Sequence, residues 1–327
     1  MASIVIRNIG PLADTGIVEL KQFNIVIGRQ STGKSTFMKI LCFCKWIEKR
    51  IMTKDGDEKI LSIYTHGGRF LNELMQFHRI NETAFSNLSE IHFIGDCISI
   101  DLVGYANPKI TRLKDFDKLR YNTKLSFIPS ERNLVSAIRN VDRAYRSNDY
   151  DVLFNHVFEW GEAKESYTAN NPINLKLVED MEYYYDHDAG DVILLKDKYV
   201  KMSPFYASSG VQSALPIMVM VDYFTGPIFD KSADINRRDV AGIFKMLNNK
   251  EIDNIAEVRA LYSYRASQLF IEEPEQNLFP GSQQTLINYI AKSINRATKR
   301  TGSDSSMTLT THSPYILTAF NVLLLAY

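Results

Sequence analysis

A short segment near the N-terminus, Gly28–Thr36, carries residue types suited to holding phosphate. It fits the pattern G-x-x-x-x-G-K-[ST] at every fixed position. The glycines of such a loop let backbone N–H groups surround a polyphosphate, and the helix that begins near Lys34 directs the positive end of its dipole to the same place. Lys34 would reach the β- and γ-phosphates, and the Ser35 hydroxyl would bind Mg²⁺. The expected nucleotide-binding residues are Gly28, Arg29, Gln30, Ser31, Thr32, Gly33, Lys34, Ser35 and Thr36.

Two adjacent carboxylates, Glu272 and Glu273, follow the apolar run Ser267–Ile271, which we predict to be a buried strand. Two charges at the end of such a strand are costly unless a cation or hydrogen bonds compensate them. With a phosphate loop upstream, Mg²⁺ is the expected cation. Glu272 would then bind the metal, and Glu273 would orient the attacking water at the γ-phosphate. The alternative is an exposed acidic turn.

His312 ends the next predicted strand, Met307–Thr311. This position suits a histidine that contacts the γ-phosphate, although an isolated histidine is more often a structural residue. We therefore name Lys34, Glu273 and His312 as the expected catalytic residues.

Two further segments carry groups that would face a ligand. The strand Leu125–Pro129 leads to Arg132, which would contact phosphate, carry a signal between subunits, or simply pair with Glu131 at a helix N-terminus. Ser208, Ser209 and Gly210 open an apolar helix, which is anion-binding geometry without a lysine. Such a turn is also an ordinary helix cap.

The surrounding patterns predict the elements that hold these residues. The apolar run Ile25–Ile27 stands before the phosphate loop, and Phe37, Ile40, Leu41 and Cys44 recur after it at helical spacing, which argues against a chance match. Antiparallel hairpins are expected at Ile91–Val103 and Val192–Met202. Helical patterns dominate Leu134–Leu177.

Bulk properties exclude several classes of protein. The 327 residues hold 38 Lys+Arg and 38 Asp+Glu, so net charge makes no case for nucleic acid. Three cysteines (Cys42, Cys44, Cys97) form neither a disulfide framework nor a metal-ligand spacing. An acidic run at 179–191 would allow a metal site, but a solvated turn is the commoner reading. No apolar run is long enough to span a bilayer, so we expect a cytoplasmic protein that does not bind membranes.

In this order, the motifs resemble the ABC-type ATPases of the SMC/RecF-like branch, and most closely the OLD-family (overcoming lysogenization defect) ATPases. The resemblance is carried by Asn8–Pro11, the phosphate loop, Phe127–Arg132, the signature-like Ser208–Gln212, the Walker B segment Ile271–Leu278 and the switch Thr311–Pro314. It implies an α/β P-loop NTPase, an ABC-type ATPase head with an antiparallel β subdomain and an inserted helical lobe. The expected parts are 1–132, with Walker A and hairpins; 133–265, the helical lobe with the signature loop near 207–213; and 266–327, with Walker B and the switch histidine.

The resemblance also implies a mechanism. Two copies would pack head to tail with ATP and Mg²⁺ between them, so that Ser208, Ser209 and Gly210 contact the γ-phosphate bound by the other copy. Asn277 would lie near the seam. The homodimer would close on ATP and open on hydrolysis.

This sequence lacks several features of the family, and these differences limit which functions the resemblance implies. No Q-loop glutamine is identified, no long coiled coil separates the halves, and no nuclease domain fits after the switch. We therefore expect the motor or sensor subunit of a DNA-repair or anti-phage defence system, with a separate nuclease or effector protein and possible DNA as partners. The alternative is an ATP-bound regulatory scaffold that holds a nuclease or toxin with little turnover.

Overall fold

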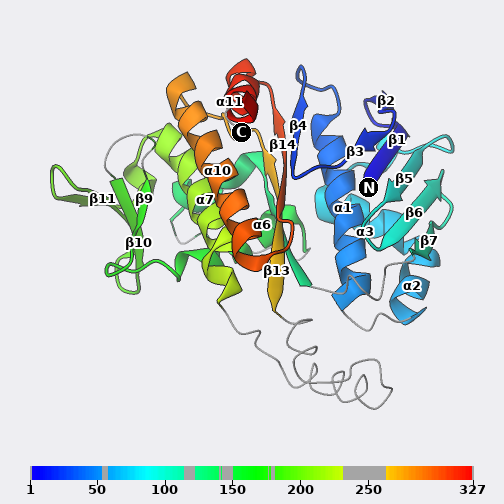
Figure 1. Cartoon of the computed structure of the whole chain (residues 1–327), viewed down its shortest axis with the longest axis horizontal. Helices are drawn as coiled ribbons and strands as arrows, with labels where there is room; N and C mark the ends of the chain where they lie inside the picture. Colours follow the sequence, from blue (N-terminus) through cyan, green and yellow to red (C-terminus); the bar gives the residue numbers. More distant parts are fainter. Residues whose placement is uncertain are drawn as a thin grey trace, which may run out of the picture.

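A parallel sheet of four strands occupies the middle of the part of the chain that the structure describes (Figure 1). The computed structural model describes residues 2–53, 58–113, 122–139, 141, 150–175, 177, 181–230 and 263–325. The strand order is β4-β14-β13-β8, and each neighbouring pair is parallel. The strands span β4 Phe23–Ile27, β14 Ser306–Thr311, β13 Tyr264–Glu272 and β8 Asn122–Ile128. The carboxyl ends of parallel strands share one edge of the sheet. The phosphate loop after β4, Glu272 at the end of β13 and His312 after β14 therefore lie at that edge.

Helix α1, Lys34–Thr53, begins where the phosphate loop ends and packs on one face of this sheet. Its apolar side chains, such as Phe37 and Leu41, are buried with Phe127 of β8 and Phe270 of β13. The helical spacing predicted this helix, and the structure confirms it. The core on this face therefore fixes the position of the loop against the sheet.

An antiparallel sheet covers the other side of α1 (Figure 1). Its order is β2-β1-β5-β6-β7, with β3 also pairing with β1. The strands span β1 Ser3–Ile9, β2 Leu12–Asp14, β3 Val18–Glu19, β5 Glu90–Ile94, β6 Ile98–Val103 and β7 Lys109–Arg112. The predicted hairpin is confirmed, since β5 and β6 pair with Ile91 opposite Leu102. Helices α2, Glu58–Thr65, and α3, Arg69–His78, complete this side.

Helices cover the opposite face of the parallel sheet. They are α4 Leu134–Ala137, α6 Val152–Lys164, α7 Ser209–Thr225, α10 Pro280–Thr301 and α11 Pro314–Leu325. Leu269, Ile271 and Leu309 point into the core that these helices build, whereas Phe270 faces α1. Successive residues of a strand point to opposite faces, so the two cores alternate along β13. Within the described ranges no helix is both long and apolar enough to cross a lipid bilayer.

The predicted lobe at 133–265 is not wholly helical. A second antiparallel sheet, ordered β12-β11-β10-β9, lies beside α7 and α10 (Figure 1). Its strands span β9 Ile173–Leu175, β10 Met181–Asp186, β11 Gly190–Leu195 and β12 Val200–Met202. The hairpin expected at Val192–Met202 is confirmed. The helical reading of Leu134–Leu177 was wrong at its end, where β9 pairs with β10 instead.

The acidic run at 179–191 is mainly strand. Tyr183 is fully buried in β10, which pairs with β9 on one side and with β11 on the other. Residues 179 and 180 lie outside the described ranges, as do 231–262 of the predicted lobe. Among described residues, no group of three or more His, Cys, Asp or Glu is placed to hold a metal ion. The division of the chain at 132 and 265 stays a prediction.

Candidate active site

Lys34 is the first residue of α1 and is almost completely buried. Its Nζ donates a hydrogen bond to the carbonyl oxygen of Arg29 at 2.8 Å and lies 3.3 Å from Nδ1 of His312. Loss of water around the ammonium group lowers the pKa of Lys34, and the charges of Glu273 and Glu275 act in the opposite direction. Lys34 is thus held at the edge of the parallel sheet, beside the other two residues predicted to be catalytic.

His312 connects Lys34 to Glu273. Its Nε2 lies 3.0 Å from Oε1 of Glu273. An ammonium group can only donate, so Nδ1 of His312 accepts from Lys34 and the ring proton lies on Nε2, where it donates to the carboxylate. The backbone N–H of His312 donates to Oε1 of Glu275 at 2.6 Å. The three residues predicted to be catalytic are therefore joined in one chain of contacts.

Glu273 has an unusual backbone. Its φ is 42°, in the left-handed region that costs a residue with a side chain about 1–2 kcal/mol. Its N–H donates to the carbonyl of Thr310 at 2.9 Å, and its own carbonyl accepts from Arg132 at 2.9 Å. The surrounding structure thus fixes this conformation, which directs the carboxylate to His312.

Glu272 faces inward and is only 4% exposed. Burial raises the pKa of its carboxyl, and the charge of Lys39, the Ser35 side chain and the Ser130 amide partly oppose this rise. Its Oε2 accepts from the N–H of Ser130 at 3.3 Å, whereas Oε1 is buried with no hydrogen-bond partner. A buried, unpaired carboxylate oxygen close to a serine hydroxyl is a donor set that fits Mg²⁺.

The phosphate loop depends on its glycines. Gly33 has a φ of +93°, and a Cβ there would lie 2.6 Å from Leu12 of β2. A Cβ on Gly28 would lie 3.1 Å from the Thr32 hydroxyl, which itself bonds the Arg29 carbonyl. Residues Arg29, Gln30, Ser31 and Thr32 are exposed, and Ser35 and Thr36 are half-buried. The loop is therefore open on the side where a ligand would approach.

Ser208 and Ser209 are exposed at the N-terminus of α7, and the Ser208 side chain makes no capping hydrogen bond. A Cβ on Gly210 would lie 2.9 Å from the Asn277 carbonyl, so this turn fits closely against the segment after Glu273. None of the hydrogen bonds in the described part of the chain joins Ser208 or Ser209 to Lys34, Glu273 or His312. One copy alone does not unite the two sets of predicted residues.

Arg132 has none of the three roles considered for it, which were phosphate contact, a signal between subunits and pairing with Glu131. Its side chain is fully buried, so it neither contacts a ligand nor lies at a subunit surface. It does not pair with Glu131 either, because its guanidinium donates only to backbone carbonyl oxygens in the described structure, including those of Glu272 and Ser213. Burial lowers its pKa to about 10. No sequence pattern indicates this burial, since Arg132 directly follows a polar turn.

Two groups at the site were missed by sequence reasoning. Glu275 holds the backbone of His312, and the amide of Ser130 holds Glu272. Glu275 follows Glu273 by two residues in an acidic run, which was the only available signal. The Ser130 amide carries no sequence signal, because every residue other than proline has a backbone N–H.

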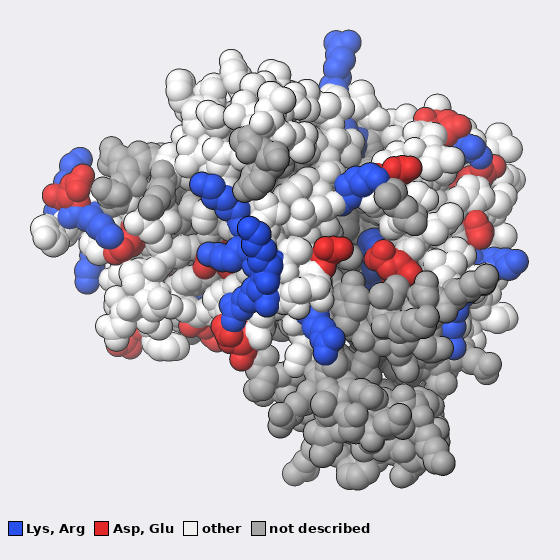
Figure 2. Space-filling view, in the orientation of Figure 1, with Lys and Arg blue, Asp and Glu red and all other residues white. Residues whose placement is uncertain are grey.

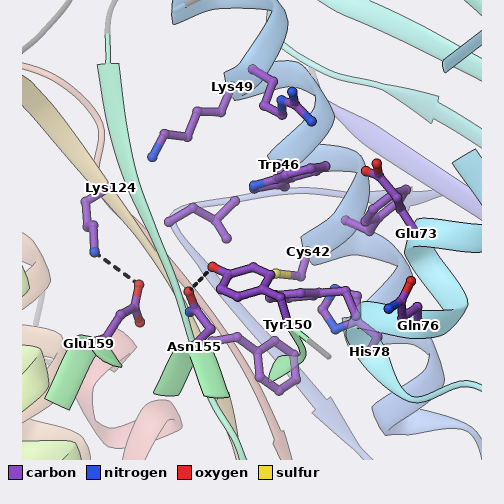
Figure 3. Close-up of a pocket in the computed structure, with 15 residues that line it drawn as sticks. Cys42, Trp46, Lys49, Glu73, Gln76, His78, Lys124, Tyr150, Asn155 and Glu159 are labelled. Carbon is purple, nitrogen blue, oxygen red and sulfur yellow. Dashed lines mark hydrogen bonds and ion pairs between the residues drawn. The ribbon is translucent and has the colours of Figure 1, made fainter. Parts of the chain in front are cut away.

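A separate cavity of about 430 Å³ lies along the second half of α1 (Figure 3). Trp46 and Lys49 of α1 face it, and Tyr150 closes another side with its hydroxyl bonded to Asn155. Trp46 lies twelve positions after Lys34, which is about 18 Å along a helix. This cavity shares none of its lining residues with the Lys34, Glu273 and His312 cluster.

Comparison with solved structures finds distant similarity in overall fold. The SMC head domain from Thermotoga maritima aligns over 97% of this chain and 90% of its own, at 9% identity and a TM-score of 0.37. An SmcHead bound to the C-winged helix domain of ScpA aligns over the same shares, at 10% identity and a TM-score of 0.40. No family model matches the chain, and no curated protein matches it. Similarity at this level assigns neither a family nor a function.

Proposed function

We propose that this chain binds and hydrolyses ATP with Mg²⁺, as an ABC-type ATPase that dimerises head to tail around the nucleotide. The observation that carries the proposal is the contact chain from Lys34 through His312 to Glu273 at the carboxyl edge of the parallel sheet. That edge is where open α/β sheets bind ligands. The contacts link a phosphate-binding lysine to a carboxylate that can accept a proton.

Lys34 and the loop 28–33 would hold the β- and γ-phosphates. The loop leads from β4 directly into α1, so its N–H groups and the helix dipole act at one place. Lys34 is buried yet next to exposed loop residues, so a triphosphate would reach it from solvent. The ammonium group would then exchange its present partners for phosphate oxygens.

Ser35 and Glu272 would hold Mg²⁺. The buried Oε1 of Glu272 has no hydrogen-bond partner, and a cation would compensate it. When bound, the metal would neutralise charge on the phosphate oxygens.

Glu273 would orient the attacking water and His312 would contact the γ-phosphate. Both side chains are about one-third exposed, so water and ligand can reach them. The hydrogen bond between them keeps the carboxylate directed to the site, and Glu275 fixes the His312 backbone. Such prearranged polar groups favour the transition state because they need no reorganisation during the reaction.

Ser208, Ser209 and Gly210 would complete the site of a second copy. The exposure of Ser208 and Ser209 at the start of α7 supports this proposal, since their hydroxyls and the helix N-terminus remain open to an anion. ATP would then favour the closed dimer because only that state supplies both sets of contacts.

A basic band on α10 is the feature that would serve a DNA partner. Its exposed residues are Lys292, Arg296, Lys299 and Arg300. Figure 2 shows a band of Lys and Arg over the position that α10 has in Figure 1. Arg296 pairs with Asp222 and Arg300 with Asp230, whereas Lys292 and Lys299 form no ion pair with the residues that the structure describes. The two lysines would therefore supply the phosphate contacts. The role in DNA repair or anti-phage defence, the separate effector and the cytoplasmic location stay predictions.

The decisive experiment compares wild type with Lys34→Ala and Glu273→Gln. Lys34→Ala should lose ATP binding, while Glu273→Gln should bind ATP, hydrolyse it about 10²-fold or more slowly, and accumulate as a dimer in size-exclusion chromatography with Mg-ATP. Equal ATP affinity in wild type and Lys34→Ala would refute the proposal. A wild-type rate no higher than that of Glu273→Gln would favour the regulatory scaffold instead.

A further inference from the structure

Arg132 joins three backbone segments that carry different parts of the proposed ATPase. Its Nε donates to the Ser213 carbonyl at 3.0 Å, and its Nη1 donates to the Pro129 and Glu272 carbonyls at 3.3 and 2.8 Å. Its Nη2 donates to the Glu273 carbonyl at 2.9 Å. A planar guanidinium offers five N–H groups in fixed directions, and four of them are used here.

The hydrogen bond from Arg132 to Glu273 helps to orient the carboxylate proposed to be catalytic. Glu273 holds a left-handed backbone, and its peptide is fixed on one side by Thr310 and on the other by Arg132. The same carbonyl also accepts from the N–H of Gln276 at 3.1 Å, so loss of the bond from Arg132 would loosen this strained peptide without releasing it completely. The carboxylate would then be held less firmly against His312.

The Ser213 end of the arrangement lies in the second turn of α7, close behind the serine turn at 208–210. A second link reaches the same residue, because Nδ2 of Asn277 donates to the Ser213 hydroxyl at 2.9 Å. Gly210 also lies against the Asn277 carbonyl with no room for a Cβ. The start of α7 and the segment 272–277 are therefore locked together within one copy.

We propose that Arg132 is a positioning residue that couples the serine turn of a copy to the catalytic carboxylate of that same copy. The inference rests on the proposed head-to-tail dimer, in which the serine turn meets the nucleotide of the other copy. Engagement of that nucleotide by Ser209 shifts α7, and Arg132 passes the shift to the Glu273 peptide. Each nucleotide thereby adjusts the hydrolysis of the other.

A double-mutant cycle on kcat tests the coupling. Arg132→Lys keeps the charge but cannot bond three segments at once, so kcat should fall about 10²-fold with ATP affinity within about threefold of wild type. Ser209→Ala should lower kcat by a similar factor. If both act through one link, the double variant should be no slower than the slower single variant. If the fold decrease in kcat of the double variant equals the product of the two single decreases, the two residues act independently and the proposal is wrong.

Asn277→Ala provides a second variant at an exposed residue, in case Arg132→Lys does not fold. It removes only the hydrogen bond from Asn277 to the Ser213 hydroxyl, so kcat should fall less than in Arg132→Lys. This decrease in kcat should also disappear when Ser209 is already replaced by alanine. An Asn277→Ala effect that persists there would contradict the coupling. Arg265→Ala, an exposed arginine on β13, is the matched control and should leave kcat unchanged. Loss of ATP binding in Lys34→Ala tests the proposed function independently of these kcat ratios.

Discussion

The Nε2 atom of His312 lies 3.0 Å from Oε1 of Glu273, although 39 positions separate the two residues in the chain. The contact exists because β13 and β14 are neighbours in the parallel sheet and both residues follow the ends of these strands. Since the lysine side of His312 accepts a hydrogen bond, its other side must donate to the carboxylate.

Replacement of His312 should therefore affect turnover more than binding. In His312→Ala we expect kcat to fall about 10²-fold, because Glu273 loses its orienting donor, with ATP affinity within about threefold of wild type. Steady-state hydrolysis and equilibrium titration with labelled nucleotide measure the two quantities. His66→Ala, at an exposed histidine, is the control. A loss of affinity equal to the loss of kcat would contradict the assignment.

Gly33→Ala should damage the phosphate loop. The backbone at residue 33 is left-handed, so a side chain there is strained, and the new Cβ would also meet the Leu12 side chain at 2.6 Å. We expect ATP affinity to fall at least about tenfold and stability to fall by about 1–3 kcal/mol. Gly161→Ala is the matched control in α6, where a Cβ meets nothing within 4 Å, and it should stabilise by about 0.5–1 kcal/mol. Urea unfolding compares both variants with wild type, and an unaffected Gly33→Ala would show that the loop tolerates a side chain.

His78 should make stability depend on pH. Burial lowers its pKa from 6.5 to about 3, so the unfolded chain binds a proton that the folded protein does not. Stability is therefore lost as the pH falls from 6.5 towards about 3, and at pH 5 the cost is about 2 kcal/mol. In His78→Phe the new ring suits the aromatic neighbours Phe43 and Phe77. Between pH 7 and pH 5, the unfolding free energy of this variant should fall by about 2 kcal/mol less than that of wild type. Equal losses in urea unfolding of both proteins would show that His78 does not carry this dependence.

The lysines of α10 should determine any binding to DNA. If the band contacts phosphates, Lys292→Ala with Lys299→Ala should weaken binding and reduce the slope of log affinity against log salt by about 2. Fluorescence anisotropy with a labelled duplex at several salt concentrations measures this slope. Lys109→Ala with Lys198→Ala is the control, because Lys109 on β7 and Lys198 in the turn between β11 and β12 are both exposed lysines outside α10. An unchanged slope would place any DNA contact elsewhere.

The central part of the fold could be predicted because its signals are local. A buried-strand pattern, a glycine-rich loop and a helical repeat specify the unit from β4 to α1 without reference to other segments. The same holds for the strands before Glu272 and His312. The sequence patterns did not predict which of these strands are neighbours in the sheet, and the structure pairs β13 with β14.

The remaining features depend on contacts between distant segments. Arg132 follows a polar turn, and only the arrangement of β8, β13 and α7 around it makes it a buried donor to carbonyls. Strand β9 is three residues long and forms only because β10 lies beside it. Such contacts cannot be predicted from residue type or spacing, because any residue can supply a backbone carbonyl and almost any residue can pair in a short strand.

The ammonium group of Lys34 is already satisfied inside its own chain, by the Arg29 carbonyl and the His312 ring. In the proposed ATPase, an incoming nucleotide would displace these partners, so its binding would be an exchange of contacts. The net gain in free energy would then be smaller than a count of new hydrogen bonds suggests. These two contacts also hold the Lys34 side chain in place beside the loop. The group proposed to bind phosphate is therefore positioned by its own chain, and each round of the proposed reaction would start from the same arrangement.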